Sequence, residues 1–259
     1  MRRRPVLLLV ALVVAVATAF AAAPAGASRP AAKPSGSITV SAAASLTEAF
    51  TAIGEKFRKR NPKATVTFNF GSSSSLVTQI QGGAPADVYA SADLTNMDKL
   101  VAGGQVTTTP TPFARNEMQI AVKPGNPMKV TSVANLATIG TVSLCGTTVP
   151  CGVYAASVLK KATVTIPESS ITRGVDAKAT IAAVAQGDAN AAIVYVTDVM
   201  GAGTSVAPVV IPAEQNVIAV YPIAPIAAST NPKLARRFIA YVVSPAGQKI
   251  LAKYGFLAA

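Results

Sequence analysis

The sequence predicts an α/β protein built on an open, mainly parallel sheet with helices on both faces. Stretches with the apolar pattern of strands alternate with stretches whose apolar residues recur at helical spacing, and several helical stretches stop at Gly. Regular alternation of this kind is typical of parallel sheets covered by helices. Two successive strand–helix sets follow each other without a visible sequence repeat, which indicates two lobes.

The first 27 residues show the pattern of a secretory signal peptide. Three arginines at positions 2–4 precede an apolar run at 5–23, and Ala25-Gly26-Ala27 is a small-x-small cleavage signal. Residues 28–37, rich in Pro, Ala and Ser, are expected to form a flexible leader. The protein is therefore expected outside the cytoplasm, in the periplasm or on the cell-envelope exterior. A retained membrane anchor stays open, because the apolar run approaches the spanning length of about 20 residues.

The first strand–helix set occupies residues 37–104. The stretch 37–45 is a strand of small residues, and it leads into a helix at 46–60 in which Leu46, Phe50, Ile53 and Phe57 share one face. The same reasoning predicts, in order, a strand at 64–70, a helix at 75–83, a strand at 86–93 and a helix at 94–104.

The second set and the tail complete the pattern. It predicts, in order, a strand at 118–124, a strand at 140–146, a helix at 152–162, a helix at 177–188, a strand at 190–196, and two final helices within 231–256 that part at Ser244-Pro245. We expect lobe 1 to comprise 38–115 with 224–259 returning to it, and lobe 2 to comprise 116–223. The chain should cross between the lobes near 113–118 and 215–224.

Charge and composition argue against a nucleic-acid partner. The formal charge of +12 falls to +9 when the three arginines of the signal peptide are removed. The densest basic group is Lys56, Arg58, Lys59, Arg60 and Lys63, at the end of a predicted helix where cations suit the helix dipole. A nucleic-acid surface would need a basic stripe interleaved with aromatic residues, whereas this chain has no Trp and only 5% aromatic residues.

Cysteine and histidine counts limit the chemistry. Cys145 and Cys151 lie six positions apart in an exported chain, which favours a local disulfide; two free buried thiols stay open as the alternative. The absence of His excludes Ser-His-Asp and Cys-His catalysis and ordinary zinc sites. The 11 acidic residues form no paired motif typical of metal or glycosidase centres. We therefore expect no enzyme; a secreted enzyme on this fold would lack a positioned base.

Hydrogen-bond donors gather where predicted strands meet predicted helices. In open α/β sheets, ligands bind beyond the carboxyl ends of the strands, where helix N-termini present free N–H groups. Four junctions qualify: Ala44-Ser45, the serine row Gly71–Ser75, Pro150-Cys151-Gly152, and Asp176-Ala177. Tyr195, at a strand end, adds a phenol. Together they describe a site of neutral donors for an anion.

Each of these features also has a purely structural interpretation. Ser45 with Glu48 fits the capping box S-x-x-E. The serine row could be a solvated turn, and Asp176 is read as a helix N-cap. Tyr195 alone is more often a packed aromatic at a strand end. Only their convergence favours the binding site.

Five stretches carry a family resemblance: VSAAASLTEAF, FGSSSSLVTQIQGGAPADVYASADLTNMD, VPCGVYA, AAIVYVTD and FIAYVVSPAGQKILAKYGF. Over residues 37–257 the chain resembles the periplasmic molybdate-binding proteins of ABC importers. The resemblance implies a two-lobed type II periplasmic-binding-protein fold, each lobe a mainly parallel sheet flanked by helices, with crossing strands as hinge. It also implies a monomer that delivers its ligand to a permease and ATPase complex.

The resemblance further implies which residues bind. Ser45 and Ser73 would contribute hydroxyl and backbone N–H groups, Cys151 and Ala177 backbone N–H groups, and Tyr195 its phenol. Asp176 would support the site as a helix N-cap. Molybdenum would be present only within the oxyanion, and no cofactor is implied. The chain departs from the family with Cys at 151, where Ala is frequent, and with Ala at 177, where a larger apolar residue is frequent.

Two further expectations concern the choice of ligand and the loop that carries Cys151. A pocket of neutral donors without a carboxylate should accept fully deprotonated tetrahedral anions, of which the resemblance favours molybdate or tungstate; sulfate or another oxyanion is the alternative. If Cys145 and Cys151 are bridged, the loop that presents the Cys151 N–H is pinned, which should lower the ordering cost of binding.

Overall fold

The computed structural model describes residues 35–259. The predicted signal peptide at 1–27 and most of the leader at 28–37 lie outside these residues. The first strand already begins at Gly36, so the last two positions assigned to the leader belong to the sheet. Between residues 35 and 259, no helix has the length and apolar character needed to cross a membrane.

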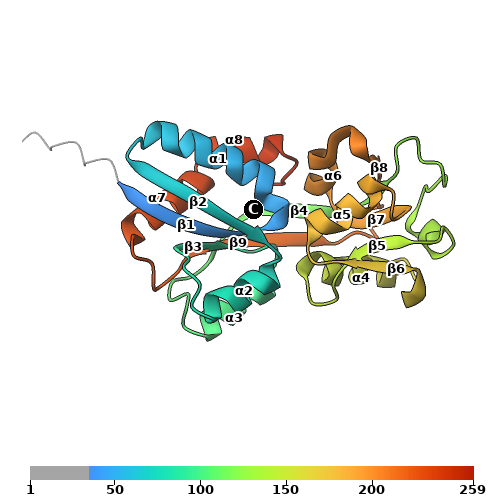
Figure 1. Cartoon of the computed structure of the whole chain (residues 1–259), viewed down its shortest axis with the longest axis horizontal. Coiled ribbons are helices and arrows are strands. Elements are labelled where there is room, and N and C mark those ends of the chain that lie inside the picture. The colour runs from blue at the N-terminus through green and yellow to red at the C-terminus, as the bar shows by residue number, and fades with distance from the viewer. Residues whose placement is uncertain (1–34) are drawn as a thin grey trace, which may run out of the picture. The chain divides into compact units, whose positions relative to one another are not determined.

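One continuous sheet runs through the described residues, in the strand order β2-β1-β3-β9-β4-β7-β5-β6, with β8 pairing to β4 (Figure 1). The strands are β1 Gly36–Ala43, β2 Ala64–Gly71, β3 Val88–Ala90, β4 Thr111–Val122, β5 Val142–Cys145, β6 Ile171–Gly174, β7 Ala191–Tyr195, β8 Ala207–Val209 and β9 Ile218–Pro225. Pairings among β1, β2 and β3 are parallel, as are those among β5, β6 and β7. We call these two groups the first and second half-sheets.

Two long strands, β4 and β9, join the half-sheets. They pair antiparallel with each other, from Thr111 opposite Ile223 to Glu117 opposite Ile218. β9 also pairs antiparallel with β3, and β4 with β7. The α/β class is therefore confirmed, while the antiparallel centre is an addition. It arises because the chain passes from one half-sheet to the other in β4 and returns in β9.

Helices cover both faces of the sheet (Figure 1). The α-helices are α1 Thr47–Arg60, α2 Ser73–Gln81, α3 Leu94–Ala102, α4 Pro150–Lys161, α5 Ala177–Gln186, α6 Val196–Ala202, α7 Pro232–Val243 and α8 Pro245–Lys253; the 3₁₀-helices are η1 Ala44–Leu46, η2 Val133–Ala137, η3 Glu168–Ser170 and η4 Gly203–Ser205. In the first half, α1, α7 and α8 lie on one face and α2 and α3 on the other. In the second half, α5 and α6 lie opposite α4.

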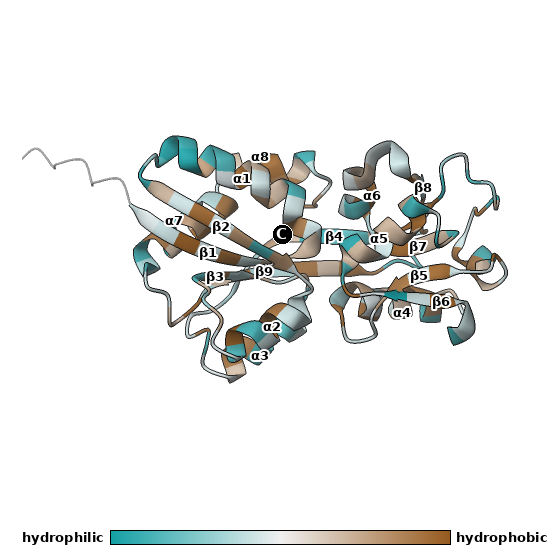
Figure 2. Cartoon of the chain, viewed as in Figure 1, coloured by the Kyte–Doolittle hydropathy of each residue, from teal (hydrophilic) through white to brown (hydrophobic). Residues whose placement is uncertain are grey.

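The core lies between the strands and the inner faces of the helices, where the apolar residues gather (Figure 2). The predicted apolar face of α1 is confirmed, since Phe50, Ile53 and Phe57 are all buried. The Phe50 ring lies 5.7 Å from that of Phe113 on β4 and 6.0 Å from that of Phe238 on α7. Aromatic packing thus fixes α1 on the sheet, and with it the residues at its start.

Candidate oxyanion site

A small cavity lies where five helical segments begin, between the two half-sheets. Its empty volume, including its mouth, is about 200 Å³. It is lined by Ala43, Ala44, Ser45, Gly71, Ser72, Ser73, Ala92, Val149, Pro150, Cys151, Asp176, Ala177 and Tyr195. All five residues expected to bind an anion are thus brought to one place. The space is below the 300–1,000 Å³ typical of pockets for drug-sized molecules.

Ser45 lies in η1, directly after β1, and its side chain is buried. Its Oγ lies 2.9 Å from the hydroxyl oxygen of Tyr221. The capping-box interpretation is wrong: among the described residues no side chain caps the start of α1, whose N-cap position is Leu46. Glu48 instead forms an ion pair with Lys178. The Ser45 hydroxyl is therefore free of a capping role.

The serines at positions 72–75 have different roles. Ser72 is the N-cap of α2, and its Oγ accepts the N–H of Ser75 at 3.2 Å and donates to the Ser75 hydroxyl at 2.7 Å. This cap begins the helix at Ser73, two residues earlier than predicted. The solvated-turn interpretation is wrong, because Ser72 and Ser73 are buried.

Ser73 is the serine of this row whose hydroxyl can donate a hydrogen bond into the cavity. Its Oγ accepts the backbone N–H of Ala92 at 3.0 Å, and its carbonyl accepts the Tyr89 hydroxyl at 3.0 Å. Because the Ala92 bond occupies a lone pair and not the proton, the hydroxyl proton stays available on a side chain that lines the cavity. Ser73 is also the first residue of α2, whose N–H has no partner within the helix.

Cys151 lies in the first turn of α4, where Pro150 occupies the first helical position. It forms the predicted disulfide with Cys145 at the end of β5, with 5.8 Å between the two Cα atoms. Gly152 allows this tight arrangement, because a Cβ there would overlap the Gly146 carbonyl oxygen. Cys151 lines the cavity, and its N–H lies in the first turn of the helix, where backbone N–H groups have no intrahelical acceptor.

Ala177 begins α5, and Asp176 is its N-cap. Oδ1 of Asp176 accepts the Ala179 N–H at 2.8 Å. Both residues line the cavity, so the lining does contain one carboxylate. The sequence argument expected none; it counted Asp176 as a cap but not as part of the wall.

Tyr195 ends β7 and is 1% exposed. Its hydroxyl has no hydrogen-bond partner among residues 35–259, although it is buried. Burial raises the pKa of the Tyr195 phenol well above its usual value of 10, so the group stays protonated and is a donor. A buried hydroxyl without a partner is costly, which points to a ligand that accepts its proton.

A buried polar chain, missed by the sequence reasoning, lies behind Ser45. Asn116 on β4 donates to the Thr197 hydroxyl at 2.9 Å and to the Tyr221 hydroxyl at 3.3 Å. The Tyr221 ring in turn lies 5.9 Å from that of Tyr195, edge to face. No local sequence signal marks Asn116 or Tyr221, because their partners are distant in the sequence: Thr197 is 81 positions from Asn116, and Ser45 is 176 positions from Tyr221.

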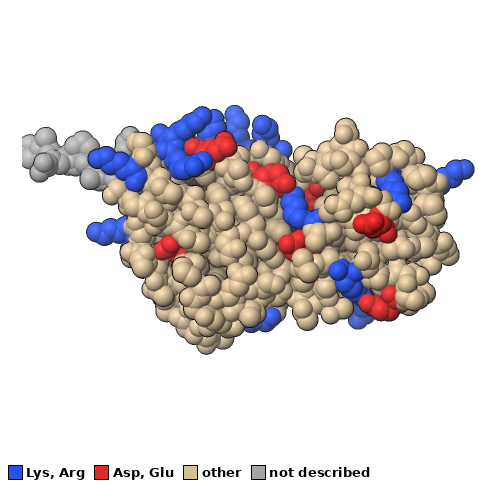
Figure 3. Space-filling view, viewed as in Figure 1, with Lys and Arg blue, Asp and Glu red and all other residues tan. Residues whose placement is uncertain are grey.

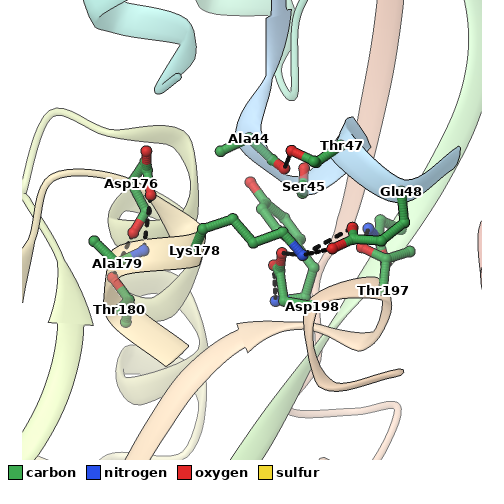
Figure 4. A network of polar contacts seen from close by, with 12 residues as sticks. Ala44, Ser45, Thr47, Glu48, Asp176, Lys178, Ala179, Thr180, Thr197 and Asp198 are labelled. Atoms are coloured by element: carbon green, nitrogen blue, oxygen red, sulfur yellow. Dashed lines mark hydrogen bonds and ion pairs between the residues drawn. The ribbon is translucent and has the colours of Figure 1, made fainter. Parts of the chain in front are cut away.

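The cavity contains no formal positive charge: within the described part of the chain, neither Lys nor Arg lines it. Lys178 lies beside it and is engaged by two carboxylates, Glu48 and Asp198 (Figure 4). Burial raises the pKa of Asp198 to about 6, while Lys178 works in the opposite direction. The basic group at the end of α1 is exposed, and Lys and Arg gather over α1 in Figure 3. Residues 35–259 contain no cluster of His, Cys, Asp or Glu that could bind a metal ion.

The arrangement suits recognition of a small anion. Residues with hydroxyl and N–H donors from five segments line one cavity, and helix N-termini add favourable potential for negative charge. Nothing in the lining resembles a base paired with a nucleophile.

Comparison with known proteins identifies relatives over nearly the whole described chain. The family model of bacterial extracellular solute-binding proteins matches residues 38–257. The molybdate-binding protein ModA of Mycobacterium tuberculosis is 42% identical over 221 residues, which is 85% of this chain and 84% of that protein.

Two solved structures share the fold. The periplasmic molybdate-binding protein of Azotobacter vinelandii has a TM-score of 0.78 at 19% identity, covering 86% of this chain and 99% of that one. The sulfate-binding protein SubI of M. tuberculosis has a TM-score of 0.77 at 21% identity, covering 86% and 87%. At these identities the likeness concerns the fold alone.

Proposed function

Because the chain belongs to the bacterial extracellular solute-binding protein family, we propose that it captures molybdate, and tungstate with it, for delivery to an ABC transporter. The 42% identical relative is named a molybdate-binding protein, and that identity extends over 85% of this chain. The protein is a binding protein and not an enzyme. Molybdate is its cargo and not a cofactor.

The observation that carries this proposal is the buried Tyr195 hydroxyl, which has no partner among the described residues and borders the cavity. A phenol held protonated in this position loses its hydration, and no protein group among the described residues compensates for that loss. A tetrahedral oxyanion in the cavity would accept its proton and those of Ser45 and Ser73. Each such charge-assisted bond contributes about 1.5–3 kcal/mol, which together offset the desolvation of a dianion.

Binding on this proposal closes two lobes. Lobe 1 comprises 38–115 and 224–259, and lobe 2 comprises 116–223. Lobe 1 supplies Ser45 and Ser73, and lobe 2 supplies the N–H groups of Cys151 and Ala177 and the phenol of Tyr195. Since β4 and β9 are the segments that join the half-sheets, they act as the hinge. Only the closed form brings both sets of donors to one anion, so ligand shifts the population toward it.

Sulfate is the second candidate, because a wall of neutral donors does not by itself distinguish tetrahedral dianions. A sulfate-binding protein has this fold as well. Molybdate is preferred on the relationship to the mycobacterial protein. Tungstate has the same charge and shape, so we expect both metals' oxyanions to bind.

Delivery on this proposal follows export of the chain. A monomer outside the cytoplasm docks in its closed form on a permease and ATPase complex and releases the anion there. Retention of the segment at 1–27 would tether the protein to the membrane, and its cleavage would release it.

Titration calorimetry of the purified protein tests the function. We expect molybdate and tungstate to bind with one site per chain and sulfate to bind more weakly. Tyr195→Phe should weaken molybdate binding roughly 10- to 100-fold, since one charge-assisted hydrogen bond is lost. The ligand-free variant should be at least as stable as the wild type, because the phenol has no partner to lose. Absence of molybdate binding by the wild type would disprove the function, and unchanged affinity of Tyr195→Phe would remove Tyr195 from the site.

A further inference from the structure

An ion pair bridges the two lobes beside the cavity. Glu48 lies in the first turn of α1, and Lys178 lies in the first turn of α5. The Lys178 ammonium donates to both carboxylate oxygens of Glu48, at 2.7 and 2.8 Å, and the two side chains are only about one third exposed (Figure 4). The contact joins segments 130 positions apart in the sequence, one from each lobe.

Lys178 has a second carboxylate partner within its own lobe. Asp198, in the first turn of α6, lies 3.5 Å from the ammonium, and its side chain is completely buried. Its other oxygen accepts the backbone N–H of Tyr195 at 3.3 Å. Asp198 therefore positions the ammonium independently of Glu48, so that little side-chain entropy is lost when Glu48 arrives.

The pair is adjacent to the donors but does not reach the anion. Glu48 follows Ser45 by three residues, and Lys178 directly follows Ala177, yet neither Glu48 nor Lys178 lines the cavity. Any movement that brings Ser45 and Ala177 to one anion brings their neighbours together as well. α6 covers the pair, since a Cβ at Gly201 would lie 3.1 Å from the Glu48 carboxyl carbon and 3.2 Å from the Lys178 Nζ.

We propose that the Glu48–Lys178 ion pair is a latch that stabilises the closed form of the two lobes without contacting the ligand. The proposal rests on the proposed function, because closure around an anion is part of it. Part of the free energy that favours the closed, ligand-bound form then comes from this contact between the lobes. The contact therefore slows opening and the release of the anion. Glu48 and Lys178 are positioning residues that act through the geometry of Ser45 and Ala177.

The effect of removing the latch should differ from the effect of removing a residue that contacts the ligand. Since the pair does not touch the anion, its loss should weaken molybdate and tungstate binding by the same factor. It should act mainly on the dissociation rate, because opening precedes release. For a partly buried, bidentate pair we expect an increase of about fivefold in both Kd and the dissociation rate.

The test compares Glu48→Gln with the wild type by calorimetry and stopped-flow dissociation of molybdate and of tungstate. Glu168→Gln is the matched control, because it removes the exposed Glu168–Arg173 pair, which lies within lobe 2. We expect the fivefold change in Glu48→Gln and none in the control. In a double-mutant cycle carried out in an Asp198→Asn background, where no buried carboxylate loses its counter-charge, Lys178→Met should add nothing to the dissociation rate of Glu48→Gln, since the interlobe pair is already absent.

A second readout tests the latch without ligand. Spin labels on Arg58→Cys and Asp188→Cys, both exposed positions in different lobes, report the lobe separation. The Glu48→Gln background should shift the ligand-free distances toward longer values. Identical distances in the two backgrounds, or wild-type dissociation rates in Glu48→Gln, would overturn the latch. Failure of the wild type to bind molybdate would instead disprove the proposed function and leave the distance comparison as the test of the latch.

Discussion

Four consecutive serines of identical chemistry have different roles because their backbone positions differ. Ser72 adopts the extended conformation of an N-cap and uses its hydroxyl on Ser75. Ser73, one residue later, is held by the Ala92 N–H so that its own proton remains free beside the cavity. A row of serines at a helix start thus builds both the helix and the site.

The buried Asp198 carboxyl predicts an unusual pH dependence. Burial raises its pKa from 3.8 to about 6, so between these values the folded protein holds one proton more than the unfolded chain. The contribution of Asp198 to stability is present below pH 4 and is lost as pH rises through 6. Asp198→Asn should therefore stabilise the ligand-free protein at pH 7, by up to about 3 kcal/mol, and should give no such gain below pH 4.

Urea denaturation of the ligand-free protein between pH 4 and pH 7 measures this difference. The exposed Asp188→Asn variant is the control for removal of a charge. If the difference in unfolding free energy between Asp198→Asn and the wild type were constant from pH 4 to pH 7, the carboxyl would not be the titrating group.

For single residues, the sequence predicted those that line the cavity better than the buried polar residues behind them. Ser45, Ser73, Cys151, Ala177 and Tyr195 were found because helix starts and strand ends leave local signals, and the cavity contains all five. The partner of Ser45, a tyrosine 176 positions away, left none. Whether these five residues bind the anion stays a prediction.

At the scale of elements, the loop between β5 and α4 leads to Cys151, whose N–H we propose as a donor to the anion. The Cys145–Cys151 disulfide closes it, Gly152 allows its close packing, and the Gly146 N–H donates to Gly174. Replacing both cysteines by Ala should lower the free energy of unfolding by about 2 kcal/mol, as expected for so short a closed loop. It should also weaken molybdate binding, because the unpinned loop must be ordered on closure.

Calorimetry and denaturation of the double variant separate these effects, with the reduced wild-type protein as a second comparison. A variant that loses stability but binds molybdate with unchanged affinity would show that the disulfide serves the fold alone.

Elements with local signals were predicted well, and those that depend on distant partners were not. The helices α1 and α3 and the strands β1 and β2 lie within a few residues of their predicted bounds. The first half of β4 was missed because Arg115, Asn116 and Glu117 interrupt its apolar pattern, and β9 because it contains Pro222 and Pro225. Both are strands because they pair with each other across the centre of the sheet. The short elements β6 and α6 were also missed, because the sequence contains no clear residues that mark where they begin and end.

At the scale of the whole molecule, cations and the anion site are separated. Lys and Arg are densest over α1 in Figure 3 and scattered over the second half, while the cavity wall has no Lys or Arg among the described residues, and Lys178 is paired beside it. On the proposed function, the lack of Lys and Arg in the wall favours release, because no ion pair between the protein and the anion has to be broken when the lobes open. We propose that affinity then depends on closure, in which β4 and β9 act as the hinge and the Glu48–Lys178 pair stabilises the closed form.

The most direct test of this account is a crystal structure grown with molybdate, with diffraction recorded near the molybdenum absorption edge. The account predicts one strong anomalous peak inside the cavity, with ligand oxygens within about 3 Å of Ser45 Oγ, Ser73 Oγ and Tyr195 Oη. A peak elsewhere on the molecule, or an occupied cavity in which these three oxygens do not reach the anion, would contradict it.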